Sequence, residues 1–463
     1  MTSLVPYLYL IAAVCFILAL KGLASPSSSR RGNLFGISGM ALAIFSTLMM
    51  PSINHHGLLL LLILAGGAIG TFIALKINMT AIPQLVAGFH SLVGLAAVLV
   101  AFCAFLSPSS FQIGEPGAIE TASLVEMSIG LMIGAITFSG SIIAFLKLQG
   151  WMTGQPLRFY GQKTVNLCIA LALIALFIAF LAFQSLSFFS SLAFLSFLLG
   201  FLLIVPIGGA DMPVVISMLN SYSGWAAAGI GFTLSNHLLV ITGALVGASG
   251  AILSYIMCVS MNRSIFNVIF GGIQAVESTT QQTKYEGQKV RQANGEDAAF
   301  LLQNARDVII VPGYGMAVAH AQHAVKELVD ALEKKGIRVR FAIHPVAGRM
   351  PGHMNVLLAE ANIPYDHVFE QSEINRDFST CDVAFVIGAN DITNPAAKTD
   401  PSSPIYGMPI LEVEKAKTIL FVKRSLSPGY AGVDNTLFFH DNTYMLFGDA
   451  KAMTESVSKA LEQ

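Results

Sequence analysis

A glycine-rich turn in the last third of the chain has the clearest chemical role. The apolar run Val308–Val311 is typical of a buried parallel strand. It is followed by Gly313, Tyr314, Gly315 and Val318, in the order Gly-Tyr-Gly-Met-Ala-Val. Two such glycines let a tight turn and its backbone approach a pyrophosphate, and the start of the next helix favours an anion. The motif therefore predicts a dinucleotide-binding turn between a strand and a helix.

The residues after the second predicted strand indicate which dinucleotide is bound. In dinucleotide-binding folds an acidic residue near this point usually binds the ribose 2′-hydroxyl of NAD. Here the strand Arg338–Ile343 leads into His344 and Pro345, without Asp or Glu. This absence favours NADP over NAD.

Basic residues suited to a 2′-phosphate follow a later strand. The predicted strand Thr418–Val422 runs into Lys423, Arg424 and Ser425. A guanidinium fork, an ammonium charge and a hydroxyl all suit a phosphate. The alternative is an ordinary charged surface. If these residues bind the 2′-phosphate, the dinucleotide lies reversed relative to its usual orientation.

Two further glycine-containing loops leave the ends of predicted strands. Residues 344–352 include Arg349, and residues 388–392 include Asn390 and Asp391. His320 and His323 are three residues apart on a predicted helix. Their spacing would suit two metal ligands, but an exposed helix face is the better interpretation, and we predict no metal site.

Polar side chains within long apolar stretches form a second candidate site. His90 is the one histidine deep in such a stretch, and histidine can load and release a proton near neutral pH. Asn220 lies in another stretch, Asp211 lies in the turn before it, and Glu126 is near the start of a third. Such groups are costly in a membrane unless they are partnered. The alternatives are a histidine that only packs, an asparagine that only joins helices, and a solvated glutamate.

Nine apolar stretches are expected to carry this second site across a membrane. The chain is 54% hydrophobic and 11% charged, whereas soluble proteins have about a quarter of their residues charged. A span needs roughly 20 apolar residues. The expected spans are residues 4–20, 34–50, 57–75, 84–106, 123–146, 164–183, 187–207, 212–232 and 238–259.

The basic residues predict the orientation of these spans. All seven Lys and Arg before residue 261 lie in the loops after spans 1, 3 and 5: Lys21, Arg30, Arg31, Lys76, Lys147, Arg158 and Lys163. Because basic loops stay in the cytoplasm, we expect the N-terminus outside and the C-terminal domain inside. The first span lacks a charged region before it and a cleavage site after it, so we expect it to be retained. The net charge of −1 gives no indication of a nucleic-acid partner.

The chain therefore divides into a transmembrane domain (1–260), a linker (261–304) and an α/β domain (305–463). Residues 261–276 are amphipathic, and residues 277–297 read as a polar tether. Alternating strands and helices predict a Rossmann-like, doubly wound parallel sheet. The expected strands are Val308–Val311, Arg338–Ile343, Val383–Ile387, Thr418–Val422 and Leu437–His440, and the expected helices are 316–335, Pro351–Ala361 and Ala450–Leu461.

Together these motifs resemble the beta subunit of proton-translocating NAD(P) transhydrogenase, over essentially the whole chain. The resemblance implies that NADP(H) binds in a reversed orientation, that Tyr430 lies in a loop over it, and that Asp391 links redox state to protonation. It also implies a proton path through His90 and Asn220, with Asp211 near its cytoplasmic mouth. The residues that match the cofactor-binding motifs are Gly313, Tyr314, Gly315, Val318, Val346, Ala347, Gly348, Arg349, Met350, Pro351, Gly388, Ala389, Asn390, Asp391, Ile392, Gly407, Met408, Lys423, Arg424, Ser425, Leu426, Ser427, Pro428, Gly429, Tyr430, Asp449 and Ala450.

No second dinucleotide motif occurs in the sequence. The resemblance therefore implies the two-subunit bacterial form, in which NAD(H) binds on an alpha subunit, in an alpha2beta2 assembly of the inner membrane. The expected reaction is hydride transfer from NADH to NADP+, coupled to inward proton movement. One alternative is a channel or transporter gated by NADP(H) sensing. Another is a transmembrane electron carrier, which would need paired deep histidines or clustered cysteines. The five cysteines are far apart, and only His90 is deep in a span.

Overall fold

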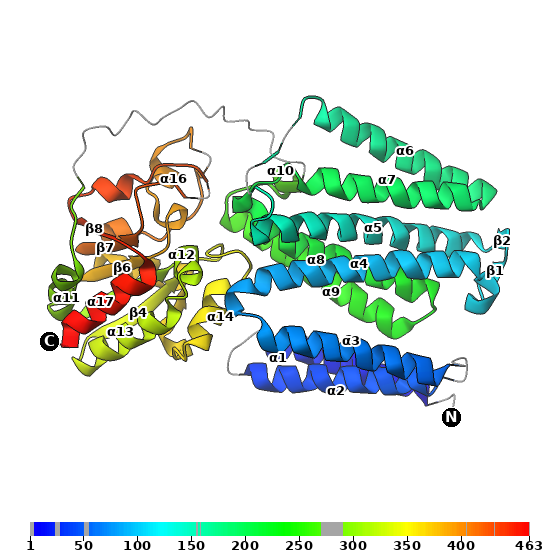
Figure 1. Cartoon of the computed structure of the whole chain (residues 1–463), viewed down its shortest axis with the longest axis horizontal. Helices are drawn as coiled ribbons and strands as arrows, with labels where there is room; N and C mark the ends of the chain where they lie inside the picture. The colour runs from blue at the N-terminus through cyan, green and yellow to red at the C-terminus, as the bar shows by residue number, and fades with distance from the viewer. Residues whose placement is uncertain are drawn as a thin grey trace. The chain divides into compact units, whose positions relative to one another are not determined.

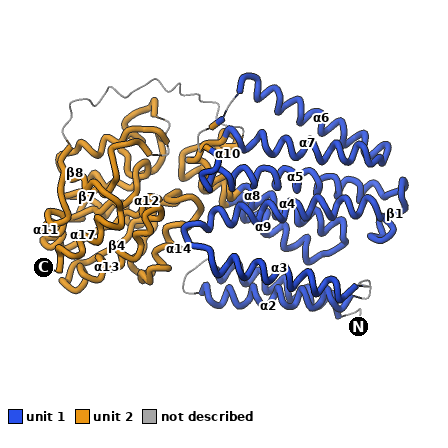
Figure 2. The backbone as a smooth tube through the Cα atoms, in the orientation of Figure 1, with its two compact units in different colours: residues 1–152, 157–206, 218–252 blue, residues 153–156, 207–217, 253–463 orange. Residues whose placement is uncertain are grey.

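The chain folds into a helical part and a part built on a parallel sheet. The computed structural model describes residues 4–23, 28–50, 55–153, 156–157, 159–269, 290–403, 405–429 and 431–462. They form two compact units, residues 1–152, 157–206 and 218–252 in one and residues 153–156, 207–217 and 253–463 in the other (Figure 2). Below, helices α1–α9 are called the bundle, and residues 290–462 are called the sheet domain.

Among the described residues, nine long helices make up the bundle, and each overlaps one expected span. In the same described part of the chain, seven of them, α1, α3, α4, α5, α6, α7 and α9, are long and apolar enough to cross a membrane, which makes the chain a membrane protein. That α2 and α8 also cross remains a prediction. The helices are α1 (Val5–Leu23), α2 (Ser29–Leu48), α3 (His56–Lys76), α4 (Ile82–Leu106), α5 (Thr121–Gln149), α6 (Gln162–Phe183), α7 (Leu186–Ile204), α8 (Met212–Thr233) and α9 (His237–Ser260).

The helix α8 is more polar than its neighbours and is well shielded. It carries Asn220, Tyr222 and three serines within seven residues, and most of its residues are buried. Polar side chains in a bundle avoid lipid by facing other helices. Burial of α8 therefore fits its composition.

Small residues bring α8 and α9 into close contact. A Cβ added to Gly224 would lie 2.2 Å from the backbone nitrogen of Gly247, and one added to Gly243 would lie 2.5 Å from that of Ala228. Gly224, Gly243 and Gly247 thus let the backbones of α8 and α9 approach closely. The glycines of α3 differ, because a Cβ on Gly66 would meet nothing within 4 Å.

In the described residues, the sheet domain contains six parallel strands in the order β5-β4-β3-β6-β7-β8. The strands β4, β6, β7 and β8 are labelled in Figure 1. Helices α11 (Gly295–Gln303), α13 (Gln322–Lys334) and α17 (Ala450–Glu462) pack together beside the sheet. The expected α/β domain with a parallel sheet is thus confirmed. The strands are β3 (Asp307–Pro312), β4 (Arg338–Ile343), β5 (Val368–Glu370), β6 (Val383–Ile387), β7 (Thr418–Lys423) and β8 (Thr443–Phe447).

The structure corrects two expected elements. The helix expected over 316–335 is broken into α12 (Tyr314–Val318) and α13, because His320 has a left-handed backbone with φ +50°. The strand expected at Leu437–His440 is a 3-10 turn, Thr436–Phe439. Its start is capped by Asn435, whose side chain accepts a hydrogen bond from Leu437 N–H. The edge strand β5 and the last strand β8 escaped the sequence analysis.

The end of the expected linker belongs to the sheet domain. Residues 295–303 form α11, which begins with a capping box between Asn294 and Asp297. Ala298, Ala299 and Leu302 of α11 join the core beneath the sheet. Residues 270–289, most of the expected tether, lie outside the described residues. In the described part of the expected amphipathic stretch, residues 265–269 form the short helix α10 (Ile265–Ile269).

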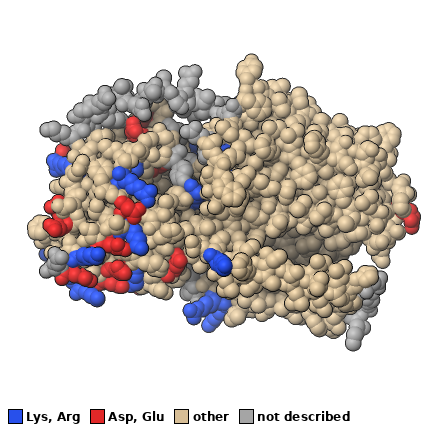
Figure 3. Space-filling view, viewed as in Figure 1, with Lys and Arg blue, Asp and Glu red and all other residues tan. Residues whose placement is uncertain are grey.

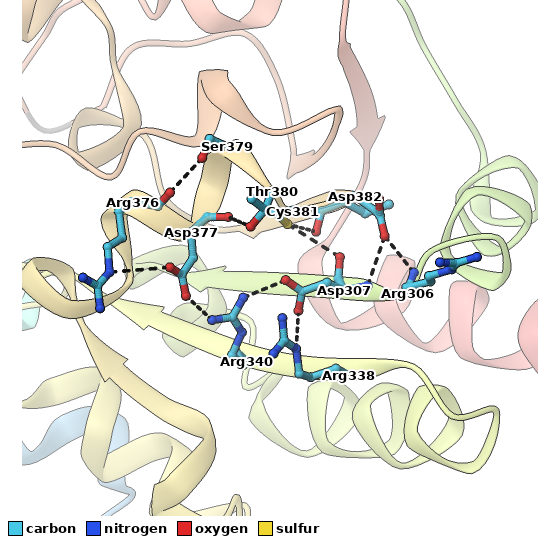
Figure 4. A network of polar contacts seen from close by, with 11 residues as sticks. Arg306, Asp307, Arg338, Arg340, Arg376, Asp377, Ser379, Thr380, Cys381 and Asp382 are labelled. Carbon is cyan, nitrogen blue, oxygen red and sulfur yellow. Dashed lines mark hydrogen bonds and ion pairs between the residues drawn. The ribbon is translucent and has the colours of Figure 1, made fainter.

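A charged network ties the strands together where they begin (Figure 4). The Asp307 carboxylate accepts from Arg340 at 2.6 Å and from Arg338 at 3.0 Å, and Arg340 also pairs with Asp377. Asp382 accepts from the Asp307 backbone N–H at 3.2 Å. Asp307 and Arg340 are about a tenth exposed, and each has its charge paired, as buried charges require. This end of the sheet is therefore a structural anchor.

Candidate functional site

The predicted nucleotide-binding loops meet at the opposite end of the sheet. The strand order reverses between β3 and β6. The loop after β3 carries Gly313 and Gly315, and the loop after β6 carries residues 388–392. Ligands of open parallel sheets bind at such a reversal, beyond the carboxyl ends of the strands.

The glycines of these two loops allow the loops to touch each other. A Cβ on Gly313 would lie 2.4 Å from Ala389 Cα, and one on Gly388, which has φ +69°, would lie 2.2 Å from Met316 N. Gly315 N–H donates to Gly388 O at 2.8 Å. The sequence analysis assigned the glycines of the β3 loop to a pyrophosphate. In the structure their closest approach is to the neighbouring loop.

The loop after β4 reaches the same place. The Arg349 guanidinium lies over the Tyr314 ring, 4.3 Å from its centroid, and Arg349 N–H donates to His353 Nδ1 at 3.1 Å. Gly348 has φ +104° and packs against His353. Burial first, and the charge of Arg349 second, lower the pKa of His353 to about 4. The loop thus rests on a neutral buried histidine and carries a cation to the glycine turn.

His344 closes the end of β4 from inside. Its Nδ1 accepts from Val346 N–H at 3.2 Å, so its Nε2 carries the proton and donates to Pro409 O at 2.7 Å. Burial lowers the pKa of His344 to about 4. Both ring nitrogens of His344 are therefore occupied by hydrogen bonds to the protein backbone. The described residues directly after β4 include no Asp or Glu that could accept a hydrogen bond from a ribose hydroxyl. The same bond anchors the segment of Gly407 and Met408, where Met408 is buried.

The three basic and hydroxyl residues after β7 point to different partners. Lys423 turns inward, with its amine 4.9 Å from the centroid of the Phe438 ring and hydrogen-bonded to Ser427 O. With the Asn390 amide in the orientation its surroundings favour, its oxygen accepts from Lys423 Nζ at 3.1 Å. Burial lowers the pKa of Lys423 to about 8, against the charges of Asp391 and Asp434, which raise it.

Arg424 and Ser425 face outward instead. Arg424 pairs with Asp449 at 2.7 Å and is about two thirds exposed. The hydrogen bond from Arg424 lowers the pKa of Asp449, and Asp449 also accepts from Lys451 N–H at the start of α17. Ser425 Oγ lies 2.8 Å from Ser427 Oγ. This gives an exposed guanidinium beside two hydroxyls.

The remaining predicted residues of this site are distributed around these loops. Val318 and Leu426 are exposed, and Ala347, Ala389, Ile392 and Ala450 are buried. Val346, Met350, Pro351 and Gly429 are partly buried, and Pro428 is exposed. Tyr430 lies outside the described residues.

Asn435 is a residue of this site that the sequence analysis missed. It is 1% exposed, and its amide donates to Asn390 O at 3.1 Å. Nearby, Ala431 N–H donates to Asp391 Oδ2 at 3.1 Å, and Asn394 donates to Asp434 O at 3.0 Å. These bonds fasten residues 431–435 across the loop that holds Asp391. An Asn just before an apolar run is a helix-start signal, and it could have revealed this role.

In the bundle, a hydrogen bond joins His90 of α4 to α8. His90 Nδ1 lies 3.0 Å from Ser223 Oγ. Asn220 precedes Ser223 by three residues, which places both on one side of α8. Ser223 was not singled out from the sequence, because isolated serines are common in membrane helices. Glu126 of α5 is partly buried.

Asp211 forms its own pair at the start of α8. Its carboxylate accepts from Arg263, which follows α9, at 3.2 Å. Asp211 precedes Asn220 by nine residues, a rise of roughly 13 Å on a helix. Asp211 is therefore a separate group from the one that contains His90.

Comparison with known proteins agrees with the motifs. A family model described as NAD(P) transhydrogenase beta subunit matches residues 5–460. Two proteins named NAD(P) transhydrogenase subunit beta, one from Rhodospirillum rubrum and one from a named strain of that species, are 63% identical over 460 residues, which is 99% of this chain and 99% of each relative. The resemblance drawn from the motifs is confirmed.

Proposed function

Because this chain belongs to the NAD(P) transhydrogenase beta subunit family, we propose that it binds NADP(H) and carries protons in a two-part transhydrogenase. In this proposal hydride passes from NADH, bound on an alpha subunit, to NADP+ on this chain. Protons move inward across the membrane at the same time. The observation that carries the proposal is the meeting of loops at the carboxyl ends of three strands. The β3 loop contacts the β6 loop at Gly388, and Lys423 at the end of β7 lies beside Asn390 and Asp391 of the same β6 loop.

The residues at the carboxyl ends of the strands fit NADP(H). The strand order corresponds to the Rossmann-like order 3-2-1-4-5-6. The exposed Arg424 and Ser425 would hold the 2′-phosphate, and no acidic group beyond β4 competes for a ribose hydroxyl. This favours the reversed orientation, with the adenosine end beside β7. When bound, the nicotinamide supplies or accepts the hydride.

The half-buried Lys423 has a different role in this proposal from Arg424. Its ammonium lies among Asn390, Asp391 and the turn at Ser427. A lysine whose pKa is lowered by burial gains from a nearby anion. Lys423 and Asp391 therefore sense the charge of the bound cofactor, and Asn435 holds their loop in place. Tyr430 is proposed to lie in the loop over the cofactor.

The bundle provides the proton path in this proposal. His90 loads the proton, Asn220 lies beside the path, and Asp211 stands near its cytoplasmic mouth. The two nicotinamides differ little in hydride affinity, so the proton gradient must supply the free energy that drives hydride transfer from NADH to NADP+. Its electrical part is about 2.3 kcal/mol per charge per 100 mV, which shifts a product ratio more than tenfold.

The proposed setting is the bacterial inner membrane. The placement of the basic residues favours an N-terminus outside and a cytoplasmic sheet domain. On the face drawn in Figure 3, Lys, Arg, Asp and Glu gather over the sheet domain and leave the helices almost uncharged. A beta subunit is expected to pair with an alpha subunit, and we propose an alpha2beta2 assembly.

Mixing the parts tests the proposal. Residues 290–463, expressed alone, should bind NADPH far more tightly than NADH and should catalyse no hydride transfer. Transfer between nicotinamide analogues should appear when a separate NAD(H)-binding subunit is added. Equal calorimetric affinity for NADH and NADPH would overturn the cofactor assignment. NADPH binding without any hydride exchange would instead favour a channel or transporter gated by NADP(H).

A further inference from the structure

The hydroxyl of Ser223 makes two contacts inside the bundle. Ser223 Oγ lies 2.8 Å from Leu219 O, one turn earlier on α8, and 3.0 Å from His90 Nδ1 on α4. Ser223 is 4% exposed. Both contacts are therefore made away from solvent, where each proton must have a definite place.

Counting protons assigns the donors. A serine hydroxyl has one proton and can also accept. Leu219 O can only accept, so the Ser223 proton goes to Leu219 O. His90 Nδ1 must then carry a proton of its own and donate to Ser223 Oγ. This bond selects the tautomer in which Nδ1 is protonated and Nε2 is free to accept.

The other ring nitrogen is left for proton exchange. Among the described residues, no protein atom makes a hydrogen bond to His90 Nε2. A proton added at Nε2 gives an imidazolium whose Nδ1 still donates to Ser223, and its release restores the neutral ring. The cycle changes nothing on the Ser223 side.

We propose that Ser223 is a positioning residue for the proton path. It fixes the ring of His90 and makes Nε2 the atom that loads and releases the proton. It does so from α8, the helix that also carries Asn220 three residues earlier. The inference rests on the proposed role of His90 in proton translocation.

Removing the hydroxyl tests this role in the assembled enzyme in vesicles. Ser223→Ala should lower proton pumping coupled to hydride exchange by roughly tenfold. Removing the hydrogen-bond partner that orients a metal-bound histidine costs about 10- to 100-fold in activity, and we expect the lower end of that range here. The pH profile of the coupled rate should also shift. The unmodified protein and Ser223→Ala share the other ionisable groups on the adjacent helices, which are Glu126 and Lys147 on α5 and Tyr222 on α8. A shift of the pH profile is therefore due to the loss of the Ser223 hydroxyl.

Matched variants separate positioning from packing. Ser223→Thr keeps a hydroxyl that can reach the same carbonyl and should restore pumping. Ser223→Cys has a similar volume, but its sulfur is a weak acceptor for the His90 N–H as well as a weak donor. It should therefore resemble Ser223→Ala, which covers the case in which alanine disturbs folding. Ser221→Ala is the control, because Ser221 donates to Gly247 O at 2.7 Å on the α9 side and should leave pumping near normal.

The outcomes distinguish the two proposals. Normal pumping in Ser223→Ala, with His90→Ala inactive, would overturn the positioning role and leave the proton path intact. Failure of an assembled Ser223→Thr enzyme to pump would also overturn it. Normal pumping in His90→Ala would remove both the role of Ser223 and the proposed path.

Discussion

The bundle and the sheet domain differ in how completely they bury their apolar residues. The core of the sheet domain consists of large apolar side chains such as Phe341, Phe385 and Phe421, all fully buried. In α3 of the bundle no residue is buried, although the helix is strongly apolar. Water drives apolar side chains inward, whereas lipid accepts them, so an apolar helix in a membrane can leave its side chains unburied. In the bundle, Phe180 and Phe189 are fully buried, but α3 is not buried at all.

The largest expected effect concerns the polar site of the bundle. His90→Ala should lower coupled proton pumping by roughly 10² to 10⁴-fold, the usual contribution of a proton-transferring group. NADPH binding should stay unchanged because it depends on the sheet domain. Vesicle acidification and calorimetry measure the two effects. His237→Ala, at the exposed start of α9, is the control, and full pumping in His90→Ala would return that histidine to a packing role.

Acid should unfold the sheet domain through its two buried histidines. His344 and His353 have pKa values lowered to about 4 from 6.5. Below pH 6.5 these histidines become protonated in the unfolded chain but stay neutral in the folded domain. The free energy of unfolding therefore falls as the pH drops from 6.5 towards 4. At pH 5 this amounts to about 2 kcal/mol for each histidine. Urea unfolding of residues 290–463 at pH 7 and pH 5 measures it, and His344→Gln should halve the slope. An unchanged slope would show that His344 does not contribute.

The outward-facing arginine should decide cofactor choice. Arg424→Ala should weaken NADPH binding by about 1.5–3 kcal/mol, or roughly 10- to 100-fold, and leave NADH binding little changed, because a charge-assisted bond to the 2′-phosphate is lost. Arg338→Ala is a matched control, since Arg338 is equally exposed and paired to an aspartate at the opposite end of the sheet. Adding Lys423→Ala should weaken the binding of both NADPH and NADH, because Lys423 lies beside Asp391 and is proposed to sense the charge of either bound cofactor. Equal losses for Arg424→Ala and Arg338→Ala would remove Arg424 from the site.

The smallest effects compare glycines in the two regions. Gly313→Ala should destabilise the sheet domain by about 1–3 kcal/mol, because the new methyl group would meet Ala389 backbone. Gly66→Ala should leave assembly and activity of the complex unchanged, because nothing lies within 4 Å of the added Cβ. Thermal unfolding measures the first effect, and activity after purification measures the second. Loss of assembly in Gly66→Ala would show that a partner covers this face of α3.

The sequence by itself determined the elements whose signals are local. Among the described residues, apolar length located the nine long helices, and short runs rich in apolar residues located β3, β4, β6 and β7. The motifs also determined the family. The strands β5 and β8 were missed. The apolar run at Thr436–Phe439 resembles a strand, but capping by Asn435 outweighs the apolar pattern there and makes it a turn.

Only the tertiary structure decided which polar groups meet. Lys423 and Arg424 are neighbours in sequence, yet Lys423 ends β7 and Arg424 begins the loop after it. The structure gives them separate partners, Asn390 and Asp449. His90 and Ser223 are 133 residues apart and meet through the packing of α4 and α8. The glycines of the β3 and β6 loops are required because a side chain at Gly313 or Gly388 would clash with the backbone of the other loop. Such contacts depend on how distant segments pack, which no local pattern records.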